Sequence, residues 1–110
     1  METKFTKGEW NKTLIDLADF GIAAISNESK VIAQCNLNSE LTDEVKANAA
    51  LISSAPNMFN SIVKLQEWSK KYPPGRIYSY GEAATIEREL TEIVEEQLKA
   101  IQKAEPSVSF

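Results

Sequence analysis

The spacing of the apolar residues changes near Asn38, and this change limits the fold more than any other feature. Before it, apolar residues fall at alternate positions, as in a half-buried strand, and after it they recur every three or four residues, as in an amphipathic helix. Two short apolar runs, residues 20–26 and 31–37, flank a polar tetrapeptide, which is typical of a β-hairpin. The sequence therefore predicts an α+β fold: a small antiparallel sheet of two to four strands, with its hairpin at about residues 20–37, followed by two or three α-helices.

The second run of this hairpin predicts one buried and one solvated face. Side chains alternate between the two faces of a strand. One face takes the apolar residues Val31, Ala33, Cys35 and Leu37, and the other takes Gln34 and Asn36. Cys35 is accordingly interpreted as a small core residue.

Two helices are expected between the hairpin and residue 72. Thr42 or Asp43 is suited to cap the first, because a side-chain oxygen there accepts from a free backbone N–H. Pro56 interrupts the helical pattern, since proline lacks the N–H and disfavours helix at the preceding residue. The first helix therefore either stops near Ser54 or kinks there, and a second one covers about residues 56–72.

The last helix is predicted to be long. Ser79 and Glu82 have the spacing of a capping box, and an apolar stripe at helical spacing continues to about Ala104. Lys99 and Lys103 lie late in this helix, where cations suit the negative end of the helix dipole.

A length of 110 residues fits a single domain, residues 1–110. Residues 1–12 are expected to form an irregular arm anchored by Trp10, and residues 105–110 a flexible tail. Residues 14–18 fit a helical period that is interrupted at Asp19. We interpret this segment as a short strand, with a helix as the open alternative.

The composition excludes several classes of function. The chain has no His and one Cys, which removes the commonest general base and any cysteine zinc site. It carries no P-loop or dinucleotide-binding fingerprint, no signal peptide, and no apolar run near the 20 or so residues that span a bilayer. A formal charge of -4 argues against binding duplex DNA. We expect a cytoplasmic protein that is not an enzyme, needs no cofactor and does not bind membranes.

One segment, residues 59–80, combines positive charge with aromatic rings. It holds four cations against one acidic residue, and five of the nine aromatics. Cations suit phosphate oxygens and rings suit stacking, so Lys70, Lys71, Arg76 and Tyr78 are the candidate ligand-binding residues. The alternative is an ordinary interhelical loop whose lysines complement the dipole of the preceding helix.

Residues 47–59 read Ala-Asn-Ala-Ala-Leu-Ile-Ser-Ser-Ala-Pro-Asn-Met-Phe. This run resembles the Ala-Asn-Ala-x-Leu-Ile-Ala-Ala-Ala-Pro-x-Leu-Leu helix of small phage and prophage accessory proteins, and residues 6–10 resemble the Thr-Pro-Gly-Pro-Trp arm that often opens them. The resemblance covers about residues 5–66. Lys7 and Glu9 stand where the arm has prolines, and Ser53 and Ser54 stand where the helix has alanines. Apart from any family, these small residues predict a smooth helix surface that a sheet or another helix can approach closely.

The resemblance implies a phage-encoded accessory protein acting in a bacterial cytoplasm, and it transfers no catalytic residue. Such proteins often counter host defences. The first hypothesis is therefore sequestration of an anionic ligand, such as a host immune-signalling nucleotide. The alternative is a protein–protein inhibitor of a host defence factor that uses an acidic surface. A third reading is a weak nucleotide-degrading enzyme.

The last helix also predicts a homo-oligomer, most simply a two-fold dimer. At 1.5 Å per residue, residues 79–104 span roughly 37 Å, which exceeds the core of a domain this small. The apolar stripe continues to Val94, Leu98 and Ile101. A second copy would cover these side chains, whereas a helix that folds back along residues 56–72 would leave a monomeric bundle.

Overall fold

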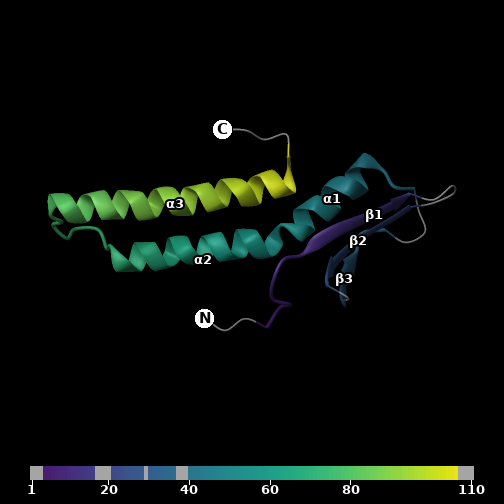
Figure 1. Ribbon diagram of the computed structural model, residues 1–110, viewed down its shortest axis with the longest axis horizontal. Helices are drawn as coiled ribbons and strands as arrows, with labels where there is room; N and C mark the ends of the chain where they lie inside the picture. The colour runs from purple at the N-terminus through teal and green to yellow at the C-terminus, as the bar shows by residue number, and fades with distance from the viewer. Residues whose placement is uncertain (1–3, 17–20, 29, 37–39, 107–110) are drawn as a thin grey trace.

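The computed structural model describes residues 4–16, 21–28, 30–36 and 40–106, and it has the predicted α+β architecture. Three antiparallel strands precede three helices, and the last helix is long (Figure 1). In chain order the elements are β1 (Asn11–Asp16), β2 (Gly21–Asn27), β3 (Lys30–Gln34), α1 (Asp43–Ser53), α2 (Ala55–Lys71) and α3 (Tyr80–Ala104).

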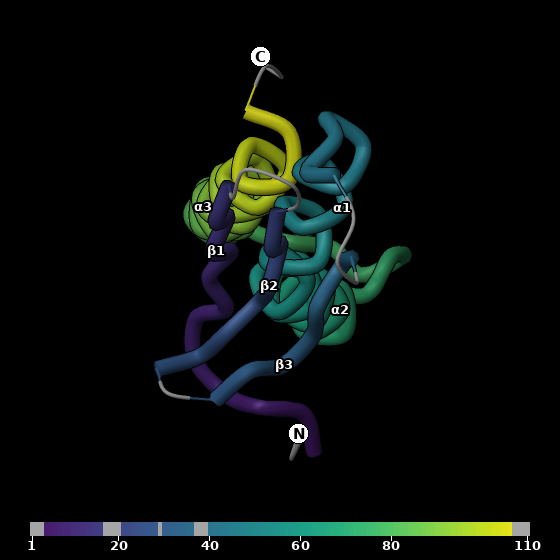
Figure 2. The backbone as a smooth tube through the Cα atoms, turned by 90° about the vertical axis from the view of Figure 1, so that its right-hand side faces the viewer, coloured from purple at the N-terminus to yellow at the C-terminus, as the bar shows by residue number. Residues whose placement is uncertain are grey.

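The sheet has the order β1-β2-β3, with β2 in the centre (Figure 2). Asn11 pairs with Ser26 at one end of the β1–β2 ladder and Asp16 pairs with Gly21 at the other. The expectation of a strand near residues 14–18 is thus confirmed as far as Asp16, and the remaining residues of that segment lie outside the described part. The expected irregular arm was two residues too long, because Asn11 and Lys12 already pair with β2.

The side predicted to be buried was wrong at two positions of the run 31–37. Val31 is 68% exposed and Asn36 is only 7% exposed, the reverse of the expectation. At Val31 the cause is a register shift: Ser26 pairs with Val31 but Ile25 pairs with Ala33, so Ile32 is an extra residue on this strand. Asn36 lies beyond the end of β3 and is buried because its side chain hydrogen-bonds to Ala23 and Gly21 of β2. A bulge of this kind breaks the alternation of side chains. Ala33 and Cys35 still pack against the core as predicted, and Leu37 lies outside the described residues.

The core lies between the sheet and α1. Ala23 and Ile25 of β2 and Ala49 of α1 are fully buried. Residues packed around them include Trp10, Ile32, Cys35, Val45 and Ile52. The smooth alanine-rich surface predicted for α1 is what brings this helix close to β2. Trp10 anchors the arm as expected, with its indole Nε1 donating to the carbonyl oxygen of Thr6 at 2.9 Å.

The helix boundaries follow the local signals. The Thr42 hydroxyl accepts from the N–H of Val45 and caps α1. Pro56 stands in the first turn of α2, so the chain forms two helices joined at Ser54. Ser79 and Glu82 form the predicted capping box at the start of α3.

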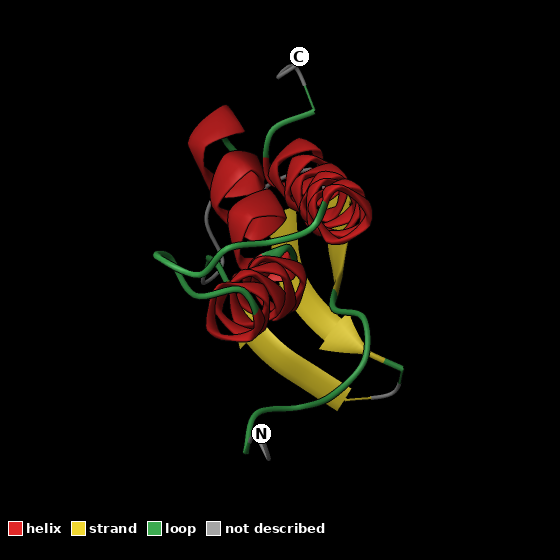
Figure 3. Cartoon of the chain, turned by 90° about the vertical axis from the view of Figure 1, so that its left-hand side faces the viewer, coloured by secondary structure: helices red, strands yellow, loops and turns green. Residues whose placement is uncertain are grey.

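Helices α2 and α3 form a long antiparallel hairpin that extends away from the sheet (Figure 1). The last helix therefore folds back along α2, as in the alternative to a dimer, yet Val94 of α3 stays 52% exposed. Figure 3 looks onto the free end of the hairpin, where the loop joins the two helices. The molecule measures 64 × 32 × 20 Å and its radius of gyration is 18.5 Å. A compact domain of 110 residues has about 13 Å, so the hairpin makes this molecule elongated.

Candidate functional surfaces of the helical hairpin

The four predicted binding residues gather at the free end of the hairpin. Lys70 and Lys71 end α2, and Arg76 and Tyr78 belong to the loop before α3. The Arg76 guanidinium lies 5.3 Å from the centroid of the Tyr78 ring, and the Tyr78 hydroxyl donates to the carbonyl oxygen of Pro73 at 2.8 Å. Lys70 is exposed and lies about 100° around α2 from Lys71. The structure therefore brings Arg76 and Tyr78 into contact, with the lysines nearby on α2.

Two of the four residues face carboxylates from α3. Lys71 Nζ lies 3.1 Å from an oxygen of Glu89, and Arg76 Nη2 lies 3.8 Å from an oxygen of Glu82. The Tyr72 hydroxyl also donates to Glu89, at 2.7 Å. The free end of the hairpin is therefore a mixed-charge surface, and Lys71 and Arg76 already have partners of opposite sign.

The hydrogen bonds of these carboxylates shift their titration. The bond from the Tyr72 hydroxyl and then that from the Lys71 ammonium hold the pKa of Glu89 below its ordinary value. The hydrogen bond with Glu89, followed by one with Tyr72, raises the pKa of Lys71. The Ser79 backbone N–H, followed by its side chain, lowers the pKa of Glu82. Both glutamates are thus ionised at neutral pH.

The aromatic residues of the segment mainly join the hairpin together. Trp68 Nε1 donates to the carbonyl oxygen of Ile86 in α3 at 3.2 Å. The Trp68, Tyr72 and Tyr78 rings follow one another at centroid distances of 5.9 and 6.1 Å. Beside them lies a shallow hollow of about 460 Å³, whose lining includes Pro73 and Leu90. This hollow is the apolar part of the predicted site.

One side of the hairpin is acidic. Four glutamates line a hollow of about 350 Å³ there together with two lysines. We call this surface the acidic face, and it consists of Glu67, Glu89, Glu92 and Glu96 with Lys64 and Lys71. Both lysines are paired within the face: Lys64 with Glu96 at 2.7 Å, and Lys71 with Glu89. The face keeps two more negative charges than positive ones.

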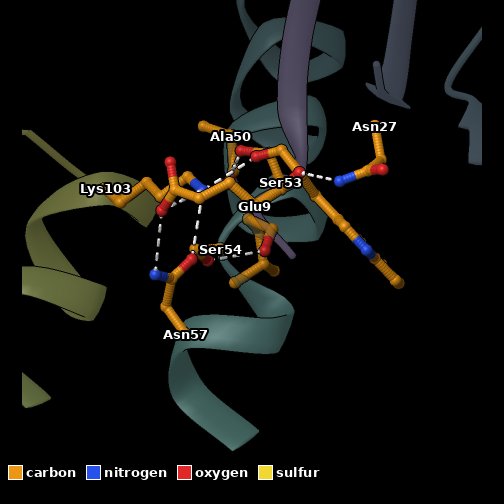
Figure 4. A network of polar contacts seen from close by, with 9 residues as sticks. Glu9, Asn27, Ala50, Ser53, Ser54, Asn57 and Lys103 are labelled. Atoms are coloured by element: carbon orange, nitrogen blue, oxygen red, sulfur yellow. Dashed lines mark hydrogen bonds and ion pairs between the residues drawn. The ribbon is translucent and has the colours of Figure 1, made fainter. Parts of the chain in front are cut away.

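The hairpin is fastened to the sheet by a polar network around Lys103 (Figure 4). Lys103 Nζ donates to the Trp10 carbonyl oxygen at 2.8 Å and to Asn57 Oδ1 at 3.0 Å. Asn27 Nδ2 donates to the carbonyl oxygen of Glu9 at 2.7 Å. The sequence predicted for Lys103 only a favourable interaction with the helix dipole. No local motif reveals a contact between residues so far apart in the chain.

The described residues do not provide what a metal site, a membrane-spanning helix or a reactive thiol requires. No group of three His, Cys, Asp or Glu side chains is placed to hold a metal ion there. None of the described helices is both long and apolar enough to cross a membrane. Burial raises the pKa of the Cys35 thiol, so the thiolate is disfavoured.

Comparison with known proteins identifies the family of the chain. No curated protein and no solved structure matches it. Residues 1–107 match a family described as Salmonella phage P22 protein Y8K6, which confirms the expectation of a small phage protein. Because this match takes in nearly all of the 110 residues, the chain belongs to the Salmonella phage P22 protein Y8K6 family.

Proposed function

We propose that this phage protein is a non-enzymatic inhibitor that binds a host defence factor through its acidic face. The observation that carries the proposal is the distribution of charge on that face. Its two lysines form ion pairs with Glu89 and Glu96. Glu67 and Glu92 also line the face but form no ion pair with any described residue. The face therefore offers unpaired carboxylates in a fixed arrangement on two rigid helices.

A basic protein surface complements this arrangement. Opposed patches of charge accelerate association and suppress wrong partners more than they raise affinity. A host factor that binds nucleic acid exposes such a basic surface, and an acidic face that covers it would block the factor. The net charge of -4 on the whole chain favours the same partner over length scales up to the Debye length.

A second candidate is sequestration of an anionic ligand, such as a signalling nucleotide, by Lys70, Lys71, Arg76 and Tyr78. The contact between Arg76 and the Tyr78 ring favours it, because the hollow beside that ring is suited to a base. Its ligand would have to replace the carboxylates of Glu82 and Glu89. Exposed ion pairs are worth at most about 1 kcal/mol, so a phosphate group is able to compete with them.

Incubation with candidate cyclic nucleotides, followed by ultrafiltration and heating to release bound ligand, separates these functions. An inhibitor leaves the nucleotides undepleted. Intact nucleotide recovered after heating supports sequestration, and altered nucleotide identifies an enzyme and contradicts both proposals.

The acidic face is tested with immobilised protein and the nucleic-acid-binding proteins of a host extract. A partner of the face is retained by the wild type and lost from Glu67→Gln/Glu92→Gln, and its retention falls steeply with salt. Glu28→Gln/Glu40→Gln makes the same change of charge on exposed residues outside the hairpin and should retain the partner. Equal retention by both double variants would contradict the proposal.

A further inference from the structure

The side of the hairpin opposite the acidic face carries a row of aliphatic residues, four of them exposed and two half-buried. We call these residues the apolar strip; they are Met58, Ile62 and Leu65 of α2 and Leu90, Val94 and Ile101 of α3. Ile62 is 63% exposed, Val94 52%, Ile101 37% and Leu65 36%. All six side chains are uncharged and non-aromatic, and Leu90 borders the hollow beside the Trp68, Tyr72 and Tyr78 rings.

Helix geometry places the strip away from the acidic face on both helices. Residues two apart on an α-helix point about 200° apart around its axis. Leu65 is two residues from Glu67, and Val94 is two residues from Glu92. Because both glutamates line the acidic face, Leu65 and Val94 point to the other side of the hairpin.

The exposed area of the whole molecule is large enough to accommodate a partner. The accessible surface is 7975 Å², whereas a compact monomer of 12.2 kDa exposes about 6,000 Å². The excess of roughly 1,900 Å² is more than the 800 Å² or so that each partner buries in a standard interface. Little is buried inside the hairpin itself, where α3 buries only Ile93 and Ala100 among the described residues.

We propose that a second copy of this chain covers the apolar strip and forms a two-fold dimer. Two hairpins packed strip to strip give four helices around one aliphatic core, which is the arrangement of a four-helix bundle. The aliphatic composition of the strip favours a permanent partner. Permanent interfaces resemble a domain core cut in half, whereas the cores of transient interfaces are rich in aromatics and Arg. The acidic faces of both copies remain on the outside, so this inference stands independently of the proposed function.

Light scattering coupled to size exclusion tests the dimer at 10–100 μM protein. The wild type should have twice the 12.2 kDa mass of the chain, and Ile62→Glu/Val94→Glu should have the mass of one chain. Asn60→Glu/Thr85→Glu adds the same two charges at exposed positions on the other side of the helices and should stay dimeric. A wild type of 12.2 kDa throughout this range would overturn the proposal, as would a dimer that survives Ile62→Glu/Val94→Glu.

Cross-linking keeps the proposal testable if the double glutamate variant fails to fold. In a Cys35→Ala background, Val94→Cys should form an intermolecular disulfide under mild oxidation, while Asn60→Cys should not. Equal cross-linking of the two variants would place the interface elsewhere and overturn the proposal, and so would no cross-linking at Val94→Cys combined with a monomeric wild type.

Discussion

The ammonium group of Lys103, in the last turn of α3, donates a hydrogen bond of 2.8 Å to the carbonyl oxygen of Trp10, 93 residues earlier. Together with its bond to Asn57, this contact joins the arm, α2 and α3 at one point. The acidic face and the apolar strip both lie on the hairpin, so this junction fixes their position relative to the sheet.

Lys103→Met should destabilise the protein by about 1–3 kcal/mol, because it leaves the Trp10 carbonyl and the Asn57 amide without their charged donor. Urea unfolding followed by circular dichroism measures the change. Lys99→Met removes a lysine from an exposed position one turn earlier and should stay within about 0.5 kcal/mol of the wild type. Equal stabilities of the two variants would show that the junction contributes nothing.

Replacing Asn36, beyond the end of β3, should also lower the stability of the protein. The Asn36 side-chain oxygen accepts from the Ala23 N–H at 2.8 Å and its amide donates to the Gly21 carbonyl oxygen at 2.7 Å. Asn36→Leu should therefore cost about 1–3 kcal/mol, since it leaves a buried donor and acceptor of β2 unsatisfied. Hydrogen exchange provides the specific check: the Ala23 amide should exchange faster relative to the other amides of β2. Unchanged protection of that amide would contradict this role.

The features predicted correctly from the sequence are those encoded within a few residues. The Thr42 cap, the capping box of Ser79 and Glu82, and the break at Pro56 each depend on neighbours in the chain, so spacing reveals them. The side of Val31 was wrong because a bulge depends on the register between two strands, which residue alternation does not contain. The side of Asn36 was wrong because this residue lies beyond the end of β3, where its side chain hydrogen-bonds to the backbone of Ala23 and Gly21.

The candidate site shows the same limit. Lys71, Arg76 and Tyr78 share the end of the hairpin as the segment suggested, but Glu82 and Glu89 reach them from α3. Which carboxylate meets which cation depends on the rotation and alignment of two packed helices. The loop sequence alone therefore overstated the positive charge of this surface.

The lowered pKa of Glu89 makes its contribution to stability depend on pH. A carboxyl group whose pKa is lower in the folded than in the unfolded state stabilises the fold above its unfolded pKa, and this contribution disappears as the pH falls through the folded value. The stability difference between the wild type and Glu89→Gln should therefore be fully present above the ordinary glutamate pKa of about 4.3 and shrink in more acidic solution.

The causes of this shift are separable by NMR titration of the Glu89 carboxyl carbon. Tyr72→Phe should raise the pKa of Glu89 more than Arg88→Gln does, because the hydrogen bond from Tyr72 is the largest cause and the charge of Arg88 the smallest. Equal shifts in the two variants would assign the effect to the general field of the helix rather than to the 2.7 Å bond.

Replacing glycine by alanine should have opposite effects on stability at Gly21 and at Gly81. A methyl group added at Gly21 would lie 2.5 Å from Leu41 Cβ and 3.2 Å from the Ile15 carbonyl oxygen, whereas nothing lies within 4 Å of one added at Gly81. Gly21→Ala should cost about 1–3 kcal/mol through this overlap, since β1 and the segment before α1 both have to move. Gly81→Ala should stabilise the protein by up to about 1 kcal/mol, because alanine is the better helix former at this exposed position in α3.

Both variants restrict the unfolded chain in the same way, so the difference between their urea midpoints reports the native surroundings alone. A Gly21→Ala variant as stable as Gly81→Ala would mean that β2 does not approach Leu41 as closely as the structure has it.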